Sequence, residues 1–173
     1  MSSRPQPDEY AGFFARYVDR VPDGDIVAIL ESQGNATQTL LASIGEEKGG
    51  YRYGPDKWSI KQVVGHMADA ERVFAYRLLA IARGEKQSLP GFEENDYVDA
   101  ANFDARSLAE LAEGFAATRR ATLALARSLD EEAWNRRGLA NNNAISARAI
   151  AWVTAGHERH HLNILQERYG IAT

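Results

Sequence analysis

The four histidines of the chain fall in two short segments. His157, His160 and His161 lie within a few residues of one another near the C-terminal end, and His66 lies far upstream. Residues four positions apart on a helix lie on the same side, so His157 and His161 can offer two imidazole nitrogens to one metal ion. A third nitrogen must come from another segment, and His66 is the only histidine outside the cluster. The pattern indicates a three-histidine metal site, provided that the two segments meet in the fold.

Three neutral imidazole nitrogens suit a divalent metal ion, with Zn²⁺ or Ni²⁺ as the first candidates, and leave a coordination position open. Because the chain has no cysteine, imidazole and carboxylate must supply any transition-metal site. An ion with neutral ligands keeps its full charge, so it could activate water for hydrolysis or a substrate thiol for S-transfer. The ligand set does not separate these reactions. The alternative interpretation is that these are ordinary core or surface histidines without a metal.

Three further polar residues lie near these histidines in the sequence. His160 is rotated by about 60° from His157 around a helix, so we expect it to point away from the shared site. Glu71 falls on the apolar side of its predicted helix, where it could orient a ligand histidine or act as a catalytic base. Asp69 lies close in angle to His66 and could contact bound water, although a solvated surface acid is the commoner case. The alternative for Glu71 is a buried ion pair with an arginine, for which the candidates are Arg119, Arg148 and Arg168.

Apolar residues recur at helical spacing in the segments that carry the histidines. His66 lies at the edge of the apolar stripe of a helix that Ser59 can cap and Gly84 can end. A second helix, from about residue 144 to 169, carries the other three histidines. Further helices are expected at residues 9–18, at 25–47, and from a cap at Asp104 or Ser107 to residue 129.

The connections between these helices differ in length. Residues 87–102 form a long irregular link, and its aromatic residues Phe92 and Tyr97 indicate that it packs against the helices. Residues 136–143 form a turn rich in Asn and Gly, and no stretch shows the alternation of a half-buried strand. The sequence therefore predicts an all-α fold. A four-helix bundle (24–173) with a long crossover connection follows an N-terminal segment (1–23) with a short extra helix.

Charge and hydropathy argue against several classes of protein. The net charge is -4 and no run of Lys or Arg is present, so the chain has no predicted surface for nucleic acid. No apolar run approaches the roughly 20 residues that span a bilayer, and the first residues lack the apolar core of a signal peptide. We expect a cytoplasmic protein without a nucleic-acid or membrane partner.

Two segments resemble motifs of the DinB/YfiT-like superfamily. The run Lys57-Trp-Ser-Ile-Lys-Gln-Val-Val-Gly-His66-Met-Ala-Asp-Ala-Glu71 is similar to a family segment with a Trp-Ser pair, a histidine and following acids. The run Gly156-His-Glu-Arg-His-His-Leu-Asn-Ile164 is similar to the family's C-terminal motif, in which one histidine is followed by a pair. The similarity extends over roughly residues 30–170.

The resemblance implies a four-helix bundle with a long crossover, and a divalent metal held at the positions of His66, His157 and His161. It also implies a homodimer, since homodimers are common in that family. The characterised members include thiol S-transferases that use bacillithiol, a mycothiol-dependent isomerase and proteins assigned as metal-dependent hydrolases. Many members have no known activity.

The sequence leaves three hypotheses for function. The first is a metal-dependent enzyme, a thiol S-transferase or a hydrolase, that acts on a small molecule such as a low-molecular-weight thiol. The second is a non-enzymatic bundle that binds a metal or serves in a stress response. A structural dimerisation module is a weaker third. The histidine site specifies a metal more clearly than a reaction.

Overall fold

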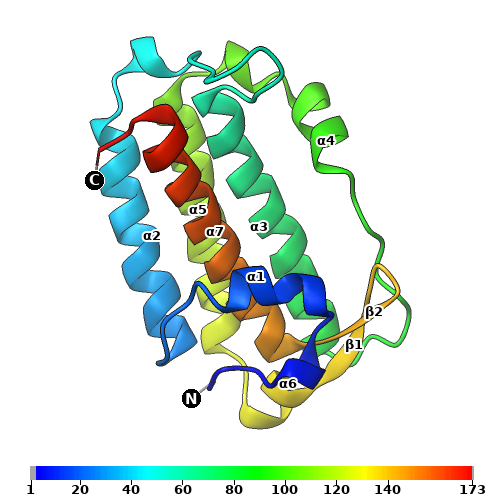
Figure 1. Ribbon diagram of the computed structural model, residues 1–173. Coiled ribbons are helices and arrows are strands. Elements are labelled where there is room, and N and C mark those ends of the chain that lie inside the picture. The colour runs from blue at the N-terminus through cyan, green and yellow to red at the C-terminus, as the bar shows by residue number, and fades with distance from the viewer. Residues whose placement is uncertain (1–2, 173) are drawn as a thin grey trace.

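Four long helices form the body of the protein (Figure 1). The computed structural model describes residues 3–172. The expected all-α four-helix bundle is confirmed, with one small two-stranded sheet added to it. The bundle helices are α2 (Ile26–Ser43), α3 (Ile60–Ala82), α5 (Leu108–Arg127) and α7 (Ala147–Tyr169).

The bundle helices do not follow one another around the bundle in chain order. α3 packs against α5 and α7, and α2 packs against the same two helices, so α2 and α3 lie diagonally opposite (Figure 1). α3 and α5 run in the same direction, which requires the chain to travel back along the bundle between them. The long crossover connection predicted from the sequence is therefore present.

Side-chain caps mark where the long helices begin. Ser59, Ser107 and Ser146 each accept a hydrogen bond from the backbone N–H three residues later, at the starts of α3, α5 and α7. At the start of α2, Asp25 accepts a hydrogen bond from the backbone N–H of Val27, two residues later. Each cap stabilises its helix by about 1 kcal/mol. Of the two caps considered for α5, Ser107 is the one used, and Asp104 instead bonds to Ser59.

A β-hairpin lies between α6 (Glu131–Asn135) and α7, where the sequence predicts only a turn. β1 (Arg137–Ala140) pairs antiparallel with β2 (Asn143–Ser146). Asn141 and Asn142 at the tip have φ values of 49° and 60°. Positive φ at both central residues is the conformation of a two-residue type I′ turn, which asparagine tolerates. Strands this short do not show a clear alternation in the sequence, so the prediction of no strand was wrong here.

The crossover (residues 83–107) contains a helix that the sequence pattern does not predict. α4 (Glu94–Ala101) replaces part of the expected irregular link and packs against α3. Leu89, near the start of the crossover, forms backbone hydrogen bonds with the hairpin. The Asp104 carboxylate, near its end, accepts a hydrogen bond from the Ser59 hydroxyl at the other end of α3. The crossover is thus tied to both ends of the bundle.

The N-terminal segment packs against α7 and is not one continuous helix. α1 (Ala15–Val18) is preceded by two 3₁₀ turns, and Tyr17 and Val18 are buried. A Cβ atom at Gly156 would lie 2.0 Å from the carbonyl oxygen of Tyr17, so a glycine is required where α7 meets α1. This contact places α1 beside the histidines of α7. The 3₁₀ turns in the described part of the chain are Pro7–Glu9, Gly12–Phe14, Glu46–Lys48 and Phe103–Ala105.

The core consists of two apolar clusters. One contains Phe74 and Leu78 from the C-terminal half of α3, and the other contains Ile60 and Val64 from its N-terminal half. The buried polar residues His66 and Glu71 of α3 lie near the boundary between the two clusters. Within residues 3–172, every helix is too short or too polar to cross a membrane.

Candidate metal centre

His66 from α3 meets His157 and His161 from α7 inside the bundle. The Nε2 atom of His157 lies 3.1 Å from the Nε2 atom of His66 and 3.1 Å from that of His161. One ring nitrogen from each of the three residues lies within 4.8 Å of the other two. Because α3 and α7 are antiparallel neighbours, side chains far apart in the sequence share one site.

The three imidazole rings are buried, with exposed fractions of 1% for His66, 5% for His157 and 8% for His161. Burial lowers the pKa of His66 to about 4. Burial, together with repulsion between the rings, holds the pKa values of His157 and His161 well below the ordinary value. All three rings are therefore neutral near neutral pH, which is the protonation state that binds a metal.

The spacing of the three nitrogens fits a divalent metal ion. Zinc–nitrogen bonds of about 2.0–2.1 Å hold ligand nitrogens about 3.3 Å apart in a tetrahedron and about 3.0 Å apart in an octahedron. The observed separations of 3.1 Å lie between these values. A neutral ring offers Nε2 as a donor or as an acceptor, depending on its tautomer, and the tautomers with three acceptor Nε2 atoms are the ones that bind a metal ion. The donor set therefore fits an ion held by His66, His157 and His161.

Aromatic side chains surround the histidines. The Trp58 ring lies 4.7 Å from the ring of His66, and the rings of Phe74 and Tyr17 each lie 5.5 Å from the ring of His157. These contacts give the site walls of low polarity. Electrostatic interactions inside such walls are stronger than in water.

An open cleft of about 280 Å³ reaches His157 from the surface. Residues of the N-terminal segment, the C-terminal half of α3 and the crossover form its walls. Glu94 of α4 also lines this cleft, and its Oε2 atom lies 3.8 Å from the Nε2 atom of His66. Burial raises the pKa of the Glu94 carboxyl. A larger groove of about 600 Å³ lies between α2 and α7 and is lined by none of the three histidines.

Glu94 is absent from the residues that the sequence pattern identifies. It belongs to the crossover, and no spacing along the chain relates it to His66. The acidic stretch around it, after Pro90 and Gly91, is the one local signal that the sequence offers. Its position depends on the path of the crossover over α3.

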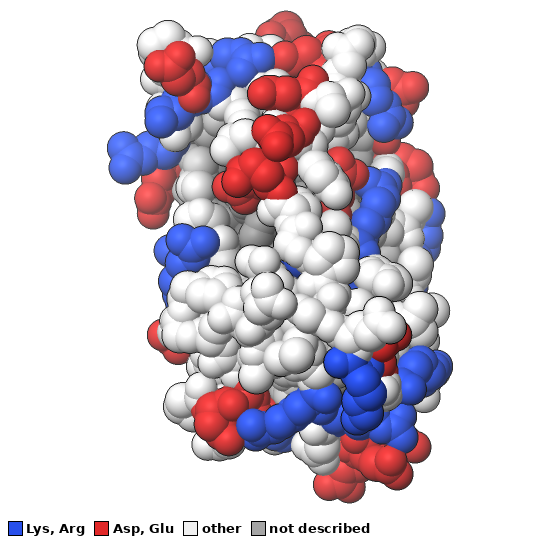
Figure 2. Space-filling view, turned by 90° about the vertical axis from the view of Figure 1, so that its right-hand side faces the viewer, with Lys and Arg blue, Asp and Glu red and all other residues white. Residues whose placement is uncertain are grey.

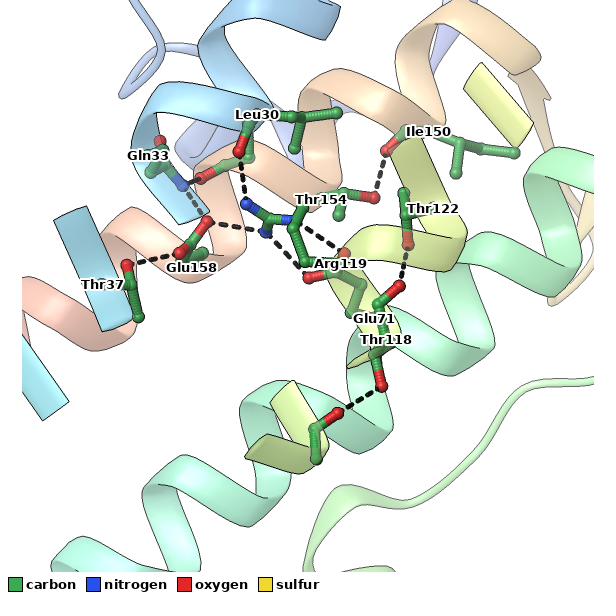
Figure 3. A network of polar contacts seen from close by, with 12 residues as sticks. Leu30, Gln33, Thr37, Glu71, Thr118, Arg119, Thr122, Ile150, Thr154 and Glu158 are labelled. Carbon is green, nitrogen blue, oxygen red and sulfur yellow. Dashed lines mark hydrogen bonds and ion pairs between the residues drawn. The ribbon is translucent and has the colours of Figure 1, made fainter. Parts of the chain in front are cut away.

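A buried ion-pair network links all four bundle helices next to the histidines (Figure 3). Arg119 of α5 donates two hydrogen bonds of 2.8 Å to Glu71 of α3 and one of 2.7 Å to Glu158 of α7. Gln33 and Thr37 of α2 also donate hydrogen bonds to Glu158. Burial opposes the charge of Arg119, but its bonds and attraction to the two carboxylates raise its pKa above the ordinary value. The network holds α3 and α7 together close to the three histidines.

The other polar residues predicted near the site take separate positions. Glu71 makes no hydrogen bond to a histidine within residues 3–172, and the buried arginine pair considered as its alternative is present. Asp69 is half-buried and forms an ion pair of 2.7 Å with Arg72. His160 is half-buried, and its ring lies 5.0 Å from the ring of His161. Catalytic roles for Glu71 and Asp69 stay predictions.

Several solved structures have the same fold at low sequence identity. YfiT from Bacillus subtilis, described as "a probable metal-dependent hydrolase with an unusual four-helix bundle topology", is 16% identical with a TM-score of 0.74, over 85% of this chain and 87% of YfiT. A mycothiol-dependent maleylpyruvate isomerase is 13% identical with a TM-score of 0.66, over 79% of this chain and 58% of the isomerase. The DinB-like protein YjoA from Bacillus subtilis is 23% identical with a TM-score of 0.58, over 82% of this chain and 88% of YjoA. No curated protein sequence matches the chain.

The family comparison covers most of the bundle. The sequence profile of the DinB superfamily matches residues 29–165. The matched stretch runs from α2 into α7 and contains the crossover and all three histidines of the candidate metal centre. Because the match covers well over half of its length, the chain belongs to the DinB superfamily.

Proposed function

We propose that the protein is a divalent-metal-dependent enzyme that acts on a small molecule, with hydrolysis as the first reaction class and thiol S-transfer as the second. The observation that carries the proposal is the convergence of three histidine nitrogens, one of which belongs to a residue that lines an open cleft, His157. Structural zinc sites are closed by four protein ligands, whereas catalytic sites keep one position for water or substrate. The ligand group within residues 3–172 has three members, which favours a catalytic site.

The two reaction classes have different support. YfiT, which shares the fold, is described as a probable metal-dependent hydrolase, and this favours hydrolysis. An isomerase with the same fold depends on mycothiol, and this favours a low-molecular-weight thiol as a substrate. Since the chain has no cysteine, the thiol of an S-transfer reaction would have to come from solution.

We assign separate roles to the side chains at the site. His66, His157 and His161 hold the ion, for which Zn²⁺ or Ni²⁺ remain the first candidates. When bound, the ion supplies Lewis-acid activation of a water molecule or of a thiol. Glu94 Oε2 accepts the proton that this molecule loses, because the carboxylate lines the same cleft as His157 and burial raises its pKa.

The two acids on α3 have supporting roles in this proposal. Glu71 positions His66 indirectly, since its bonds to Arg119 hold α3 against the other helices. Asp69 would contact water at the edge of the site. An Asp69→Asn variant tests that role, because a catalytic contact lowers turnover whereas a solvated surface acid leaves it unchanged.

The first test is metal analysis of protein purified without chelator. We expect about one Zn²⁺ or Ni²⁺ per chain, as in sites with three histidine ligands. Protein that remains metal-free after incubation with both ions would refute the proposal. Light scattering on the same sample tests the predicted homodimer, whose mass would be twice the 19.1 kDa of the chain.

The second test separates the reactions. The metal-loaded protein is assayed against a panel of esters and amides, and against an electrophile with a series of low-molecular-weight thiols. Metal-dependent product release without a thiol assigns hydrolysis, and metal-dependent loss of the electrophile only with a thiol assigns S-transfer. A metal-loaded protein with neither activity would favour the non-enzymatic alternative.

A further inference from the structure

Arg77 of α3 is a buried cation without an acidic partner among the described residues. Its exposed fraction is 6%, and its Nη2 atom donates a hydrogen bond of 2.7 Å to the backbone carbonyl of Pro90. Its Nε atom is fully buried and has no hydrogen-bond partner within residues 3–172. Arg119, which is also buried, differs because it bonds to two carboxylates. A buried guanidinium stays charged and is costly without a partner, so Arg77 indicates a partner that comes from outside the chain.

Arg77 lines the cleft that reaches the candidate metal centre at His157, and it also lines a neighbouring cleft between α3 and the crossover. Arg77 and His157 both line the cleft of about 280 Å³. Phe74, one turn before Arg77 on α3, packs against the ring of His157 at 5.5 Å. Along the axis of α3, Arg77 lies roughly 16 Å beyond His66. A molecule of moderate length can therefore reach both the guanidinium and the histidines.

The other charged groups of the cleft do not neutralise Arg77. Arg16 and Glu94 both line the cleft and carry opposite charges, so together they add no net charge to it. Glu93 is exposed and accepts hydrogen bonds from Asn95. Figure 2 shows acidic side chains gathered at the level of α4, with a band of uncharged side chains below them. Exposed charges of this kind are screened over about 8 Å at physiological ionic strength.

We propose that the cleft takes a substrate with a carboxylate, which Arg77 binds while the reactive group of the substrate lies at the three histidines. This assignment rests on the proposed function and names its substrate class. A guanidinium has five N–H donors in a planar fork, and a carboxylate accepts two of them in parallel. The ring of Phe92, with its centroid 5.8 Å from the guanidinium carbon of Arg77, supplies an apolar wall. The substrate is therefore a small organic acid with an apolar segment between its carboxylate and its reactive group.

Binding of two matched probes to the zinc-loaded protein tests the assignment. The probes are 3-phenylpropanoate and 3-phenylpropanamide, which have the same shape and differ in charge. NMR titration should give a dissociation constant at least about tenfold lower for the carboxylate, since charge-assisted hydrogen bonds are about twice as strong as neutral ones. The Arg77→Gln variant should bind both probes equally. Equal binding of the two probes by the wild-type protein overturns the inference.

Two variants separate the guanidinium from other causes. Arg77→Lys keeps the charge and can still reach Pro90, so it should fold even if Arg77→Gln does not, and it should keep part of the preference. Arg120→Gln removes an exposed arginine that pairs with Glu113, and it should leave the preference unchanged. A preference that Arg120→Gln removes as well would indicate a general charge effect and would overturn the inference.

A carboxylate can also bind a metal ion directly, so the last experiment separates binding by Arg77 from binding by the metal. Removing zinc with EDTA should leave the carboxylate preference in place. If the carboxylate preference is lost when zinc is removed but is kept in the Arg77→Gln variant, the carboxylate binds the metal and the inference is overturned. In protein loaded with Co²⁺, the ring protons of the bound probe should show paramagnetic relaxation. If the probe binds through Arg77 but its ring protons show no paramagnetic relaxation, the probe lies in another cleft, and this result also overturns the inference.

The inference and the proposed function can fail separately. Turnover by metal-loaded protein without any carboxylate preference overturns the inference and leaves the function intact. A protein that binds no metal but prefers the carboxylate through Arg77 supports the anion site and refutes the function.

Discussion

His157 occupies the centre of the candidate metal site, because its Nε2 atom lies 3.1 Å from the Nε2 atoms of both His66 and His161. Loss of either outer ring leaves one close pair of nitrogens. Loss of the central ring leaves two nitrogens on different helices. His157 is therefore the single residue whose removal distinguishes a metal centre from three core histidines.

We expect His157→Ala to lower metal affinity by at least about 100-fold, since even the loss of a partner that only orients a ligand costs 10–100-fold. Metal content after dialysis, measured by mass spectrometry, should fall from about one ion per chain to nearly none. His160→Ala is the matched control on the same helix, and it should keep its metal. Equal metal content in both variants would contradict the ligand assignment.

Glu94 is the carboxylate closest to the histidines within the described residues, and its role as a proton acceptor can be tested separately from metal binding. Glu94→Gln keeps the shape of the side chain and removes its basicity. We expect turnover to fall by about 10²–10⁴-fold, the usual contribution of a general base, while metal content stays the same. Asp96→Asn on the exposed surface of α4 is the control. Unchanged turnover in Glu94→Gln would assign the proton transfer to another group.

At the scale of the helices, Arg119 connects the elements that carry the site. It bonds to Glu71 on α3 and Glu158 on α7, and its Nη1 atom donates to the carbonyl of Leu30 on α2. Two carboxylates share this one guanidinium. Removing Arg119 therefore leaves two buried negative charges, whereas neutralising Glu71 leaves one balanced pair.

This arrangement predicts an order of stability. Arg119→Met should lower the free energy of unfolding by about 3–5 kcal/mol, as expected when a buried charge loses its partner. Glu71→Gln should cost about 1–3 kcal/mol, because the amide can still accept a hydrogen bond from Arg119. Urea denaturation measures both values, and Arg120→Met at the adjacent exposed position should change stability by less than about 0.5 kcal/mol. A larger loss of stability in Glu71→Gln than in Arg119→Met would show that the two carboxylates do not share the charge of Arg119.

At the scale of the whole molecule, the buried neutral histidines make the stability of the metal-free protein depend on pH. The pKa of His66 is about 4 in the folded state, against 6.5 for an unperturbed histidine. Between these values the unfolded chain binds a proton that the folded chain does not. The free energy of unfolding should therefore fall as the pH drops from 6.5 to 4.

His66 alone should account for about 3 kcal/mol of this loss, since one pKa unit corresponds to about 1.4 kcal/mol. Urea denaturation of EDTA-treated protein across this pH range measures the effect. A His66→Gln variant should show a shallower dependence on pH, because one of the three titrating rings is gone. A pH-independent wild-type protein would show that the rings are not held neutral in the folded state.

The parts of the fold that rest on local signals could be predicted from the sequence. Ser59 caps α3 and Gly170 ends α7, as serine and glycine do at helix ends. The spacing of His157 and His161 places both rings on one side of α7, and His66, the only histidine outside the cluster, supplied the third position. α3 and α7 then bring the three rings together.

The parts that depend on tertiary structure could not be predicted in this way. α4 has one buried residue, Val98, so it shows almost no apolar stripe. The hairpin depends on positive φ values at Asn141 and Asn142, which an Asn-rich loop allows but does not require. Glu94 and Arg77 belong to the cleft only because the crossover lies over α3. The clearest signal for Arg77, the lack of an acidic partner within residues 3–172, can be seen only in the folded structure.

In the proposed function, part of the substrate contact lies in the crossover, whereas the metal ligands and Arg77 lie on the bundle helices. The three histidines belong to α3 and α7, whereas Phe92 and Glu94 at the cleft belong to the crossover, which is anchored at Leu89 and Asp104. A graft of residues 85–106 from another member of the superfamily would exchange one cleft wall without touching a histidine. Replacing this segment could then change substrate specificity. The three histidines, the bundle helices and their buried ion pairs would stay the same.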